Sequence, residues 1–178
     1  MATQTLNAIG FCAHYSSQGD WAFNYALRLS KLHNIPLNVF HFLEDPYDTL
    51  NSIPPNLTKK ERTQLAIERE RELRIYYDRL AGDYLEVGFR LCEDNEWTEL
   101  HRCLIIREFQ ILVLGYTTPG ATFAGIPIEQ FANNFICPVV LVGPDNPDQF
   151  KLNSRAELII NELDLPAECW SRIEHNIS

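Results

Sequence analysis

The sequence has few basic side chains compared with acidic ones. It has 15 lysines and arginines against 24 aspartates and glutamates, a formal net charge of −9 over 178 residues. A protein of this sign repels phosphate backbones and anionic lipid head groups. The composition therefore argues against a nucleic-acid-binding or membrane-surface protein, and we expect neither nucleic acid nor membrane among its partners.

Long hydrophobic runs are also missing. No apolar segment approaches the roughly 20 residues that a membrane-spanning helix needs. The first residues, MATQTLNAIGFC, do not combine a basic region with a following apolar one, so no secretory signal is predicted. We therefore expect a cytoplasmic protein.

A regular cysteine pattern is missing. The five cysteines form no Cys-x-x-Cys pair, and they are Cys12, Cys92, Cys103, Cys137 and Cys169. An odd, scattered set is typical neither of a disulfide framework nor of a zinc site. Four of the five lie in or beside apolar segments, which indicates buried structural thiols and no metal centre.

The sequence does contain a regular alternation of strand and helix patterns. Short apolar runs predict strands at 7–13, 36–43, 84–92, 111–115 and 138–143. Apolar residues at helical spacing predict helices at 20–33, 58–80, 95–107 and up to 135. This alternation predicts an α/β fold with a five-stranded, parallel, doubly wound sheet.

The last 35 residues, 144–178, differ in character. They carry three basic and seven acidic side chains, a net −4, and two short amphipathic stretches at 154–163 and 166–173. We interpret them as a helical hairpin packed on the core or on a partner subunit. The predicted organisation is thus an α/β domain at 1–143 and a C-terminal helical extension at 144–178.

The helix predicted at 58–80 carries side chains of alternating charge from Glu68 to Arg74. Such a run is typical of a solvated face with weak ion pairs. We therefore assign it no binding role. The segment before it, 44–57, is rich in Pro, Asp and Asn and is interpreted as a loop.

Several pieces in the same order resemble the universal stress protein (UspA-like) family across 7–143. These pieces are YS at 15–16, YAL at 25–27, FHF at 40–42, ILVLG at 111–115 and CPVVLVG at 137–143. The last two, separated by a glycine-bearing loop and a helix, are the most specific part of the resemblance.

The resemblance implies a strand order and a dimer. The expected order is 3-2-1-4-5, in an adenine-nucleotide α-hydrolase-like sheet, with a homodimer formed through the edge of the fifth strand. That strand contains Val139, Val140, Leu141 and Val142, and no charge protects its edge from pairing. An isologous dimer is consistent with such an edge.

The resemblance also implies a ligand site at the carboxyl ends of the strands. Nucleotide-binding members carry an Asp at the end of the first strand and a loop of the form Gly-x2-Gly-x9-Gly-Ser/Thr. The corresponding candidate ligand-binding residues here are Cys12, His14, Ser16, Phe42, Gly115, Tyr116, Thr118, Gly120 and Gly125.

This sequence departs from the nucleotide-binding pattern at several positions. His14 stands where the Asp is expected, Thr118 where the second Gly is expected, and Ile126 follows Gly125 in place of the hydroxyl residue. The loop is three residues short, and no Lys or Arg occurs from 108 to 150. These departures disfavour tight ATP binding, because few donors and no cation are left for a triphosphate.

Alternatives remain open for individual residues. His14 can contact a ligand or simply fill the crevice, and the three glycines of the loop can approach phosphate oxygens or serve turns. Cys12 and His14 lie on the same side of a strand, but no oxyanion stabiliser can be named for a nucleophilic reaction.

The leading hypothesis is a dimeric, non-catalytic binding or regulatory module of the stress response that does not bind ATP tightly. The alternative is a family member that binds ATP or AMP through an atypical phosphate loop, with at most slow hydrolysis. No cofactor is assigned, and ATP, AMP or another adenosine-type ligand is the candidate.

Overall fold

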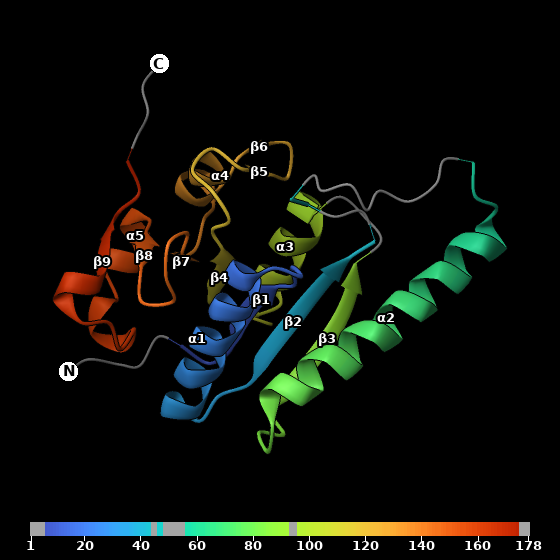
Figure 1. The fold of residues 1–178 in the computed structure, drawn as a ribbon, viewed down its shortest axis with the longest axis horizontal. Helices are drawn as coiled ribbons and strands as arrows, with labels where there is room; N and C mark the ends of the chain where they lie inside the picture. The colour runs from blue at the N-terminus through green and yellow to red at the C-terminus, as the bar shows by residue number, and fades with distance from the viewer. Residues whose placement is uncertain (1–5, 44–45, 48–55, 93–95, 175–178) are drawn as a thin grey trace.

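A seven-stranded sheet runs through the molecule in the order β3-β2-β1-β4-β7-β8-β9 (Figure 1). The computed structural model describes residues 6–43, 46–47, 56–92 and 96–174. The strands of the sheet are β1 (Ile9–Cys12), β2 (Leu37–Phe42), β3 (Val87–Cys92), β4 (Ile111–Gly115), β7 (Val139–Val142), β8 (Phe150–Leu152) and β9 (Trp170–Arg172). A separate antiparallel hairpin consists of β5 (Thr122–Phe123) and β6 (Ile126–Pro127).

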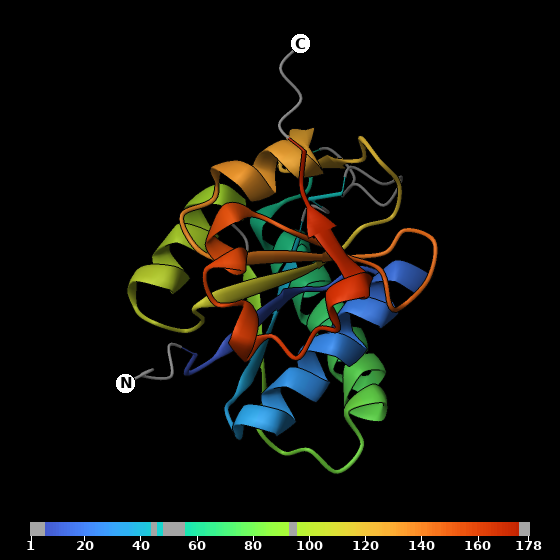
Figure 2. The same ribbon diagram turned by 90° about the vertical axis from the view of Figure 1, so that its left-hand side faces the viewer.

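Helices cover both faces of this sheet (Figure 1, Figure 2). One core cluster joins α1 (Ser17–His33) and α2 (Lys59–Ala81) to one face. A second cluster joins α3 (Glu96–Ile105) and α4 (Ile128–Asn134) to the other face. The sheet is therefore the middle layer of three.

The predicted fold class and strand order are confirmed. The five parallel strands lie in the order β3-β2-β1-β4-β7, which is the expected order 3-2-1-4-5 because β7 is the fifth of them along the chain. Every residue of β1, β4 and β7 is buried. Burial on both faces explains why these strands are continuous apolar runs in the sequence.

The C-terminal segment packs on the core and is partly helical, as expected, but it also contains two strands and is not a simple helical hairpin. It adds β8 antiparallel to β7, and then β9 parallel to β8, to the main sheet. Its helical parts are short: α5 (Ser154–Glu157) and two 3₁₀ turns, η1 (Ile160–Glu162) and η2 (Ala167–Cys169). Phe150, Leu152 and Leu163 join the core beside α1, so residues 150–163 belong to the packed body of the domain.

The outer edge of the fifth parallel strand is not free, as the expected edge-paired dimer requires, but is paired within the chain. Val139, Val140, Leu141 and Val142 are fully buried. Val140, Leu141 and Val142 pair with Leu152, Lys151 and Phe150 of β8. Because β8 uses the backbone groups of this edge, a second copy can pair with β7 only if β8 leaves.

Helix α2 carries two of the side chains that line a cavity at the carboxyl ends of β1 and β2. Its start is fixed by a capping box, in which Thr58 Oγ1 accepts a hydrogen bond from Glu61 N at 3.1 Å and Glu61 Oε1 accepts one from Thr58 N at 3.3 Å. Of the loop predicted before it at 44–57, residues 44–45 and 48–55 lie outside the described residues.

None of the helices in the described part of the chain is long and apolar enough to cross a membrane.

Candidate functional site

A cavity of about 240 Å³ lies at the carboxyl ends of β1 and β2 and is lined on one side by α2. In a doubly wound sheet this end of the strands is where ligands bind. The lining residues come from the segment after β1, the end of β2, the segment after it, and α2. They are Ala13, His14, Tyr15, His41, Phe42, Pro46, Arg69 and Glu72.

The position of His14 is fixed by the start of α1. Its Nδ1 lies 2.8 Å from Ser16 Oγ, and Ser16 caps the helix by accepting a hydrogen bond from Gly19 N at 2.9 Å. Since Ser16 Oγ already accepts one bond, its hydroxyl can donate to a neutral Nδ1, and Nε2 then carries the ring proton. Ser16 is thus a positioning residue behind the cavity.

Tyr47 fills the crevice between the ends of β1 and β4. Its ring centroid lies 4.1 Å from that of His14 and 5.0 Å from that of Phe123, and its hydroxyl donates to Gly115 O at 3.0 Å. Tyr47 is 6% exposed. The cavity beside His14 is therefore separated from the loop after β4 by a buried aromatic side chain.

Two glycines of the loop after β4 are needed for turns of the backbone. Pro119 and Gly120 occupy a turn in which Ala121 N donates to Thr118 O at 3.0 Å, and Gly120 has a φ of 80°. Ala124 and Gly125, with φ of 55° and 84°, form the two-residue turn between β5 and β6.

Gly115 serves close packing at the end of β4. A Cβ at this position would lie 2.9 Å from Gly19 N at the start of α1. Thr118 is exposed on the loop surface. The geometry thus gives a structural reason for each of the three loop glycines that the sequence had offered as a phosphate cradle.

Two hydrogen-bond donors of this loop, which a phosphate could otherwise use, already bind a carboxylate of the chain. Glu129 Oε1, in the first turn of α4, accepts hydrogen bonds from Gly120 N at 2.8 Å and from Tyr116 Oη at 2.6 Å. Burial raises the pKa of Tyr116, and the bond to Glu129 raises it further, so the phenol stays a donor. A phosphate here would have to displace Glu129 and overcome its negative charge.

The structure brings together only part of the candidate residues. His14 and Phe42 line the cavity, with Ser16 behind His14. The loop residues, including Tyr116 and Gly120, lie beyond Tyr47. Cys12 is fully buried in the core cluster beneath α3 and α4, so it has no access to the cavity.

Two charged residues of α2 were missed. Arg69, which is half-buried, and Glu72, which is exposed as expected for this face, line the cavity. Arg69 also donates to Leu43 O at 2.7 Å. Helical spacing could have revealed them, because positions 69 and 72 lie on the same face as Leu73 and Tyr76.

Tyr15 lines the cavity and packs against two tyrosines of α2. The ring centroid of Tyr15 lies 5.0 Å from that of Tyr76 and 6.2 Å from that of Tyr77, and Tyr76 Oη donates to Asp20 Oδ1 at 2.6 Å. Burial, together with the bond to Asp20, raises the pKa of Tyr76 to about 12. Burial also raises the pKa of Tyr15 and Tyr77.

We expect this tyrosine cluster to make the fold sensitive to alkali. A tyrosine with a raised pKa in the folded state binds its proton more tightly there than in the unfolded chain, so its contribution is complete below about pH 10 and decreases as the pH rises towards 12. The free energy of unfolding in urea, measured between pH 9 and pH 12, should fall steadily. Tyr76→Phe should flatten this fall, whereas an unchanged slope would contradict the assignment.

Comparison with solved structures identifies the fold. A structure from the universal stress protein family of Burkholderia pseudomallei matches with a TM-score of 0.50 and 18% identity, over 76% of this chain and 95% of the other. A universal stress protein in complex with cAMP matches with a TM-score of 0.53 and 14% identity, over 80% of this chain and 100% of the other. No family model and no curated protein matches the sequence. The similarity shows a UspA-like fold.

Proposed function

We propose that this chain, which has the universal stress protein fold, is a binding and regulatory module of the stress response whose ligand is an adenosine-type molecule with little or no phosphate. The observation that carries the proposal is the division of the site by Tyr47. An open cavity remains on the β1–β2 side, while on the other side Glu129 accepts the hydrogen bond of Gly120 N in the loop after β4.

The size and charge of the cavity support a compact, weakly charged ligand. Its volume of about 240 Å³ lies below the roughly 300 Å³ at which pockets for drug-sized ligands begin. Arg69 and Glu72 contribute one charge of each sign to the lining, and the histidines and Tyr15 offer polar atoms. Such a lining suits a base or a nucleoside better than a triphosphate.

The matching structure of a universal stress protein with cAMP supports an adenosine-type ligand as the first candidate. ATP binding with slow hydrolysis would require Glu129 to leave Gly120 N, and no lysine or arginine occurs from 108 to 150 to offset the phosphates. We therefore propose binding without catalysis.

Thermal unfolding with adenosine, cAMP, AMP and ATP tests this function. A ligand at a hundred times its dissociation constant stabilises the folded state by about 2.7 kcal/mol. We expect the shift in Tm to decrease from adenosine to ATP, and His14→Ala to weaken adenosine binding by roughly tenfold, because the ring lines the cavity.

His101→Ala is the matched control, since His101 is a half-buried histidine of α3 that bonds Trp97 O outside the cavity. It should leave the adenosine shift unchanged. No shift with any of the four ligands, or a shift that is largest for ATP, would overturn the proposed function.

A further inference from the structure

A second hollow, of about 450 Å³, lies at the opposite, amino-terminal end of the sheet. It lies where α3 ends, where β4 and β7 begin, and beside α5. We call it the arginine groove; its lining includes the apolar side chains of Leu104, Phe109, Ile136 and Leu158 and the charged side chains of Arg107 and Arg155. Leu158 is 85% exposed and Ile136 is 50% exposed, so an apolar surface is left open here.

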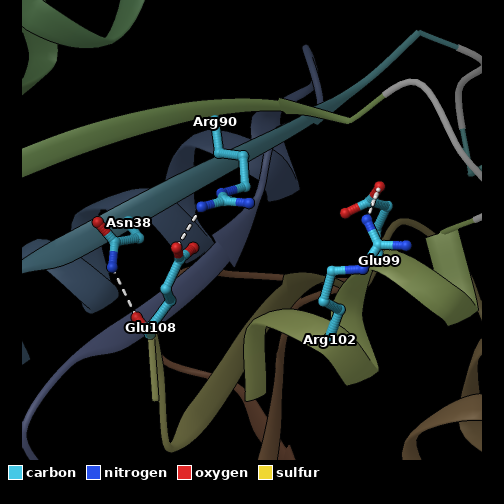
Figure 3. A network of polar contacts seen from close by, with 5 residues as sticks. All are labelled: Asn38, Arg90, Glu99, Arg102 and Glu108. Atoms are coloured by element: carbon cyan, nitrogen blue, oxygen red, sulfur yellow. Dashed lines mark hydrogen bonds and ion pairs between the residues drawn. The ribbon is translucent and has the colours of Figure 1, made fainter. Parts of the chain in front are cut away.

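The charge of the arginine groove is positive. Arg107 and Arg155 are its charged lining residues, and neither forms an ion pair with the described part of the chain. The adjacent Glu108 is engaged by Arg90 (Figure 3), and Glu157 is paired with Arg172 at 2.8 Å. The groove is therefore a cationic, apolar surface on a protein with a net charge of −9.

The same chain displays a surface of complementary character, the turn between α2 and β3. Leu85 is 91% exposed, and Asp83 and Glu86 beside it are exposed. Neither acid forms an ion pair with a described residue. The turn is held in place by Tyr84, whose hydroxyl donates to Ile35 O at 2.6 Å.

The turn and the groove lie at the same end of the molecule. Asp83–Glu86 immediately precedes β3, and the groove includes residues that immediately precede β4 and β7. The starts of parallel strands share one edge of a sheet. Two copies related by a twofold axis can thus each place the turn against the groove of the other.

We propose that two copies of this chain associate through these surfaces, with the Asp83–Glu86 turn of each copy in the arginine groove of the other. Asp83 and Glu86 pair with Arg107 and Arg155, and Leu85 covers the apolar lining. This association leaves the edge of β7 with β8, in contrast to the edge-paired dimer that the sequence suggested. It does not depend on the ligand of the other cavity.

Charge reversal on each surface tests the proposal. The wild-type chain should sediment as a dimer of twice 20.6 kDa at micromolar concentration. Arg107→Glu with Arg155→Glu, and separately Asp83→Lys with Glu86→Lys, should each raise the dissociation constant by roughly tenfold or more, because like charges then face each other. All four positions are exposed, so both variants should keep the wild-type circular dichroism spectrum.

Mixing the two variants is the decisive step. In the mixed dimer the acidic turn of one copy meets the wild-type groove, and the lysine turn of the other meets the glutamate groove, so dimerisation should be restored. Lys60→Glu with Arg71→Glu makes the same charge change as the arginine double variant, but on exposed residues of α2; it is the control and should remain dimeric. A monomeric wild-type chain, a dimer unaffected by either double variant, or a mixture that stays monomeric would overturn the proposal.

Discussion

Asn153→Ala should lower the free energy of unfolding by about 3–5 kcal/mol, because it leaves several buried backbone groups without partners. Asn153 is 2% exposed and its amide is fully used. Oδ1 accepts from Val139 N at 3.0 Å and Ala156 N at 2.9 Å, and Nδ2 donates to Ala132 O at 2.8 Å and Cys137 O at 3.0 Å.

This one side chain joins the C-terminal segment to the parallel sheet. Its partners lie in α4, before and within β7, and in α5. A loss of this size is a large part of the 5–15 kcal/mol that ordinarily separates folded from unfolded domains. We therefore expect the variant to unfold at a markedly lower urea concentration, as measured by tryptophan fluorescence.

Asn146→Ala is the matched control. Asn146 is exposed in the turn before β8, where its Oδ1 accepts one bond from Asp148 N at 2.9 Å. Its removal should cost less than about 1 kcal/mol, since water can replace an exposed partner. If Asn153→Ala were as mild as this control, the C-terminal segment would be a detachable addition and not part of the cooperative fold.

Glu129→Gln should improve the binding of AMP by roughly tenfold while changing the binding of adenosine by less than about twofold. The amide keeps the shape of the side chain and an oxygen acceptor for Gly120 N and Tyr116 Oη. It removes the negative charge that a phosphate near the loop after β4 would face. Titration calorimetry with both ligands measures the two effects separately.

Glu168→Gln is the control for net charge. Glu168 is an exposed carboxylate of η2, so its replacement changes the charge of the protein by the same amount outside the loop. It should leave both affinities unchanged. Equal AMP affinities in the wild type and in Glu129→Gln would show that the phosphate of a bound nucleotide does not approach this loop.

The alternation of strands and helices was predictable because it depends on local periodicity. Runs such as 111–115 are apolar at every position when a strand is covered on both faces, and the resemblance then supplied the strand order. His14 and Phe42 were predicted as site residues because each follows or ends a strand at the edge where ligands bind.

The C-terminal strands were not predictable in the same way. β8 and β9 have three residues each, FKL and WSR, which is too short for an alternating pattern to stand out from an amphipathic helix. Their pairing depends on the register of Val140 with Leu152 and of Leu152 with Arg172, contacts that no local pattern contains.

The sequence by itself determined the α/β class, the parallel core and the end of the sheet at which the candidate site lies. The tertiary structure alone decided how that site is divided. Tyr47 fills the crevice, Glu129 binds the amide of Gly120 nine positions earlier, and Arg69 and Glu72 reach the cavity from α2. Periodicity reports which faces of an element are buried, whereas these contacts depend on where separate elements meet in space.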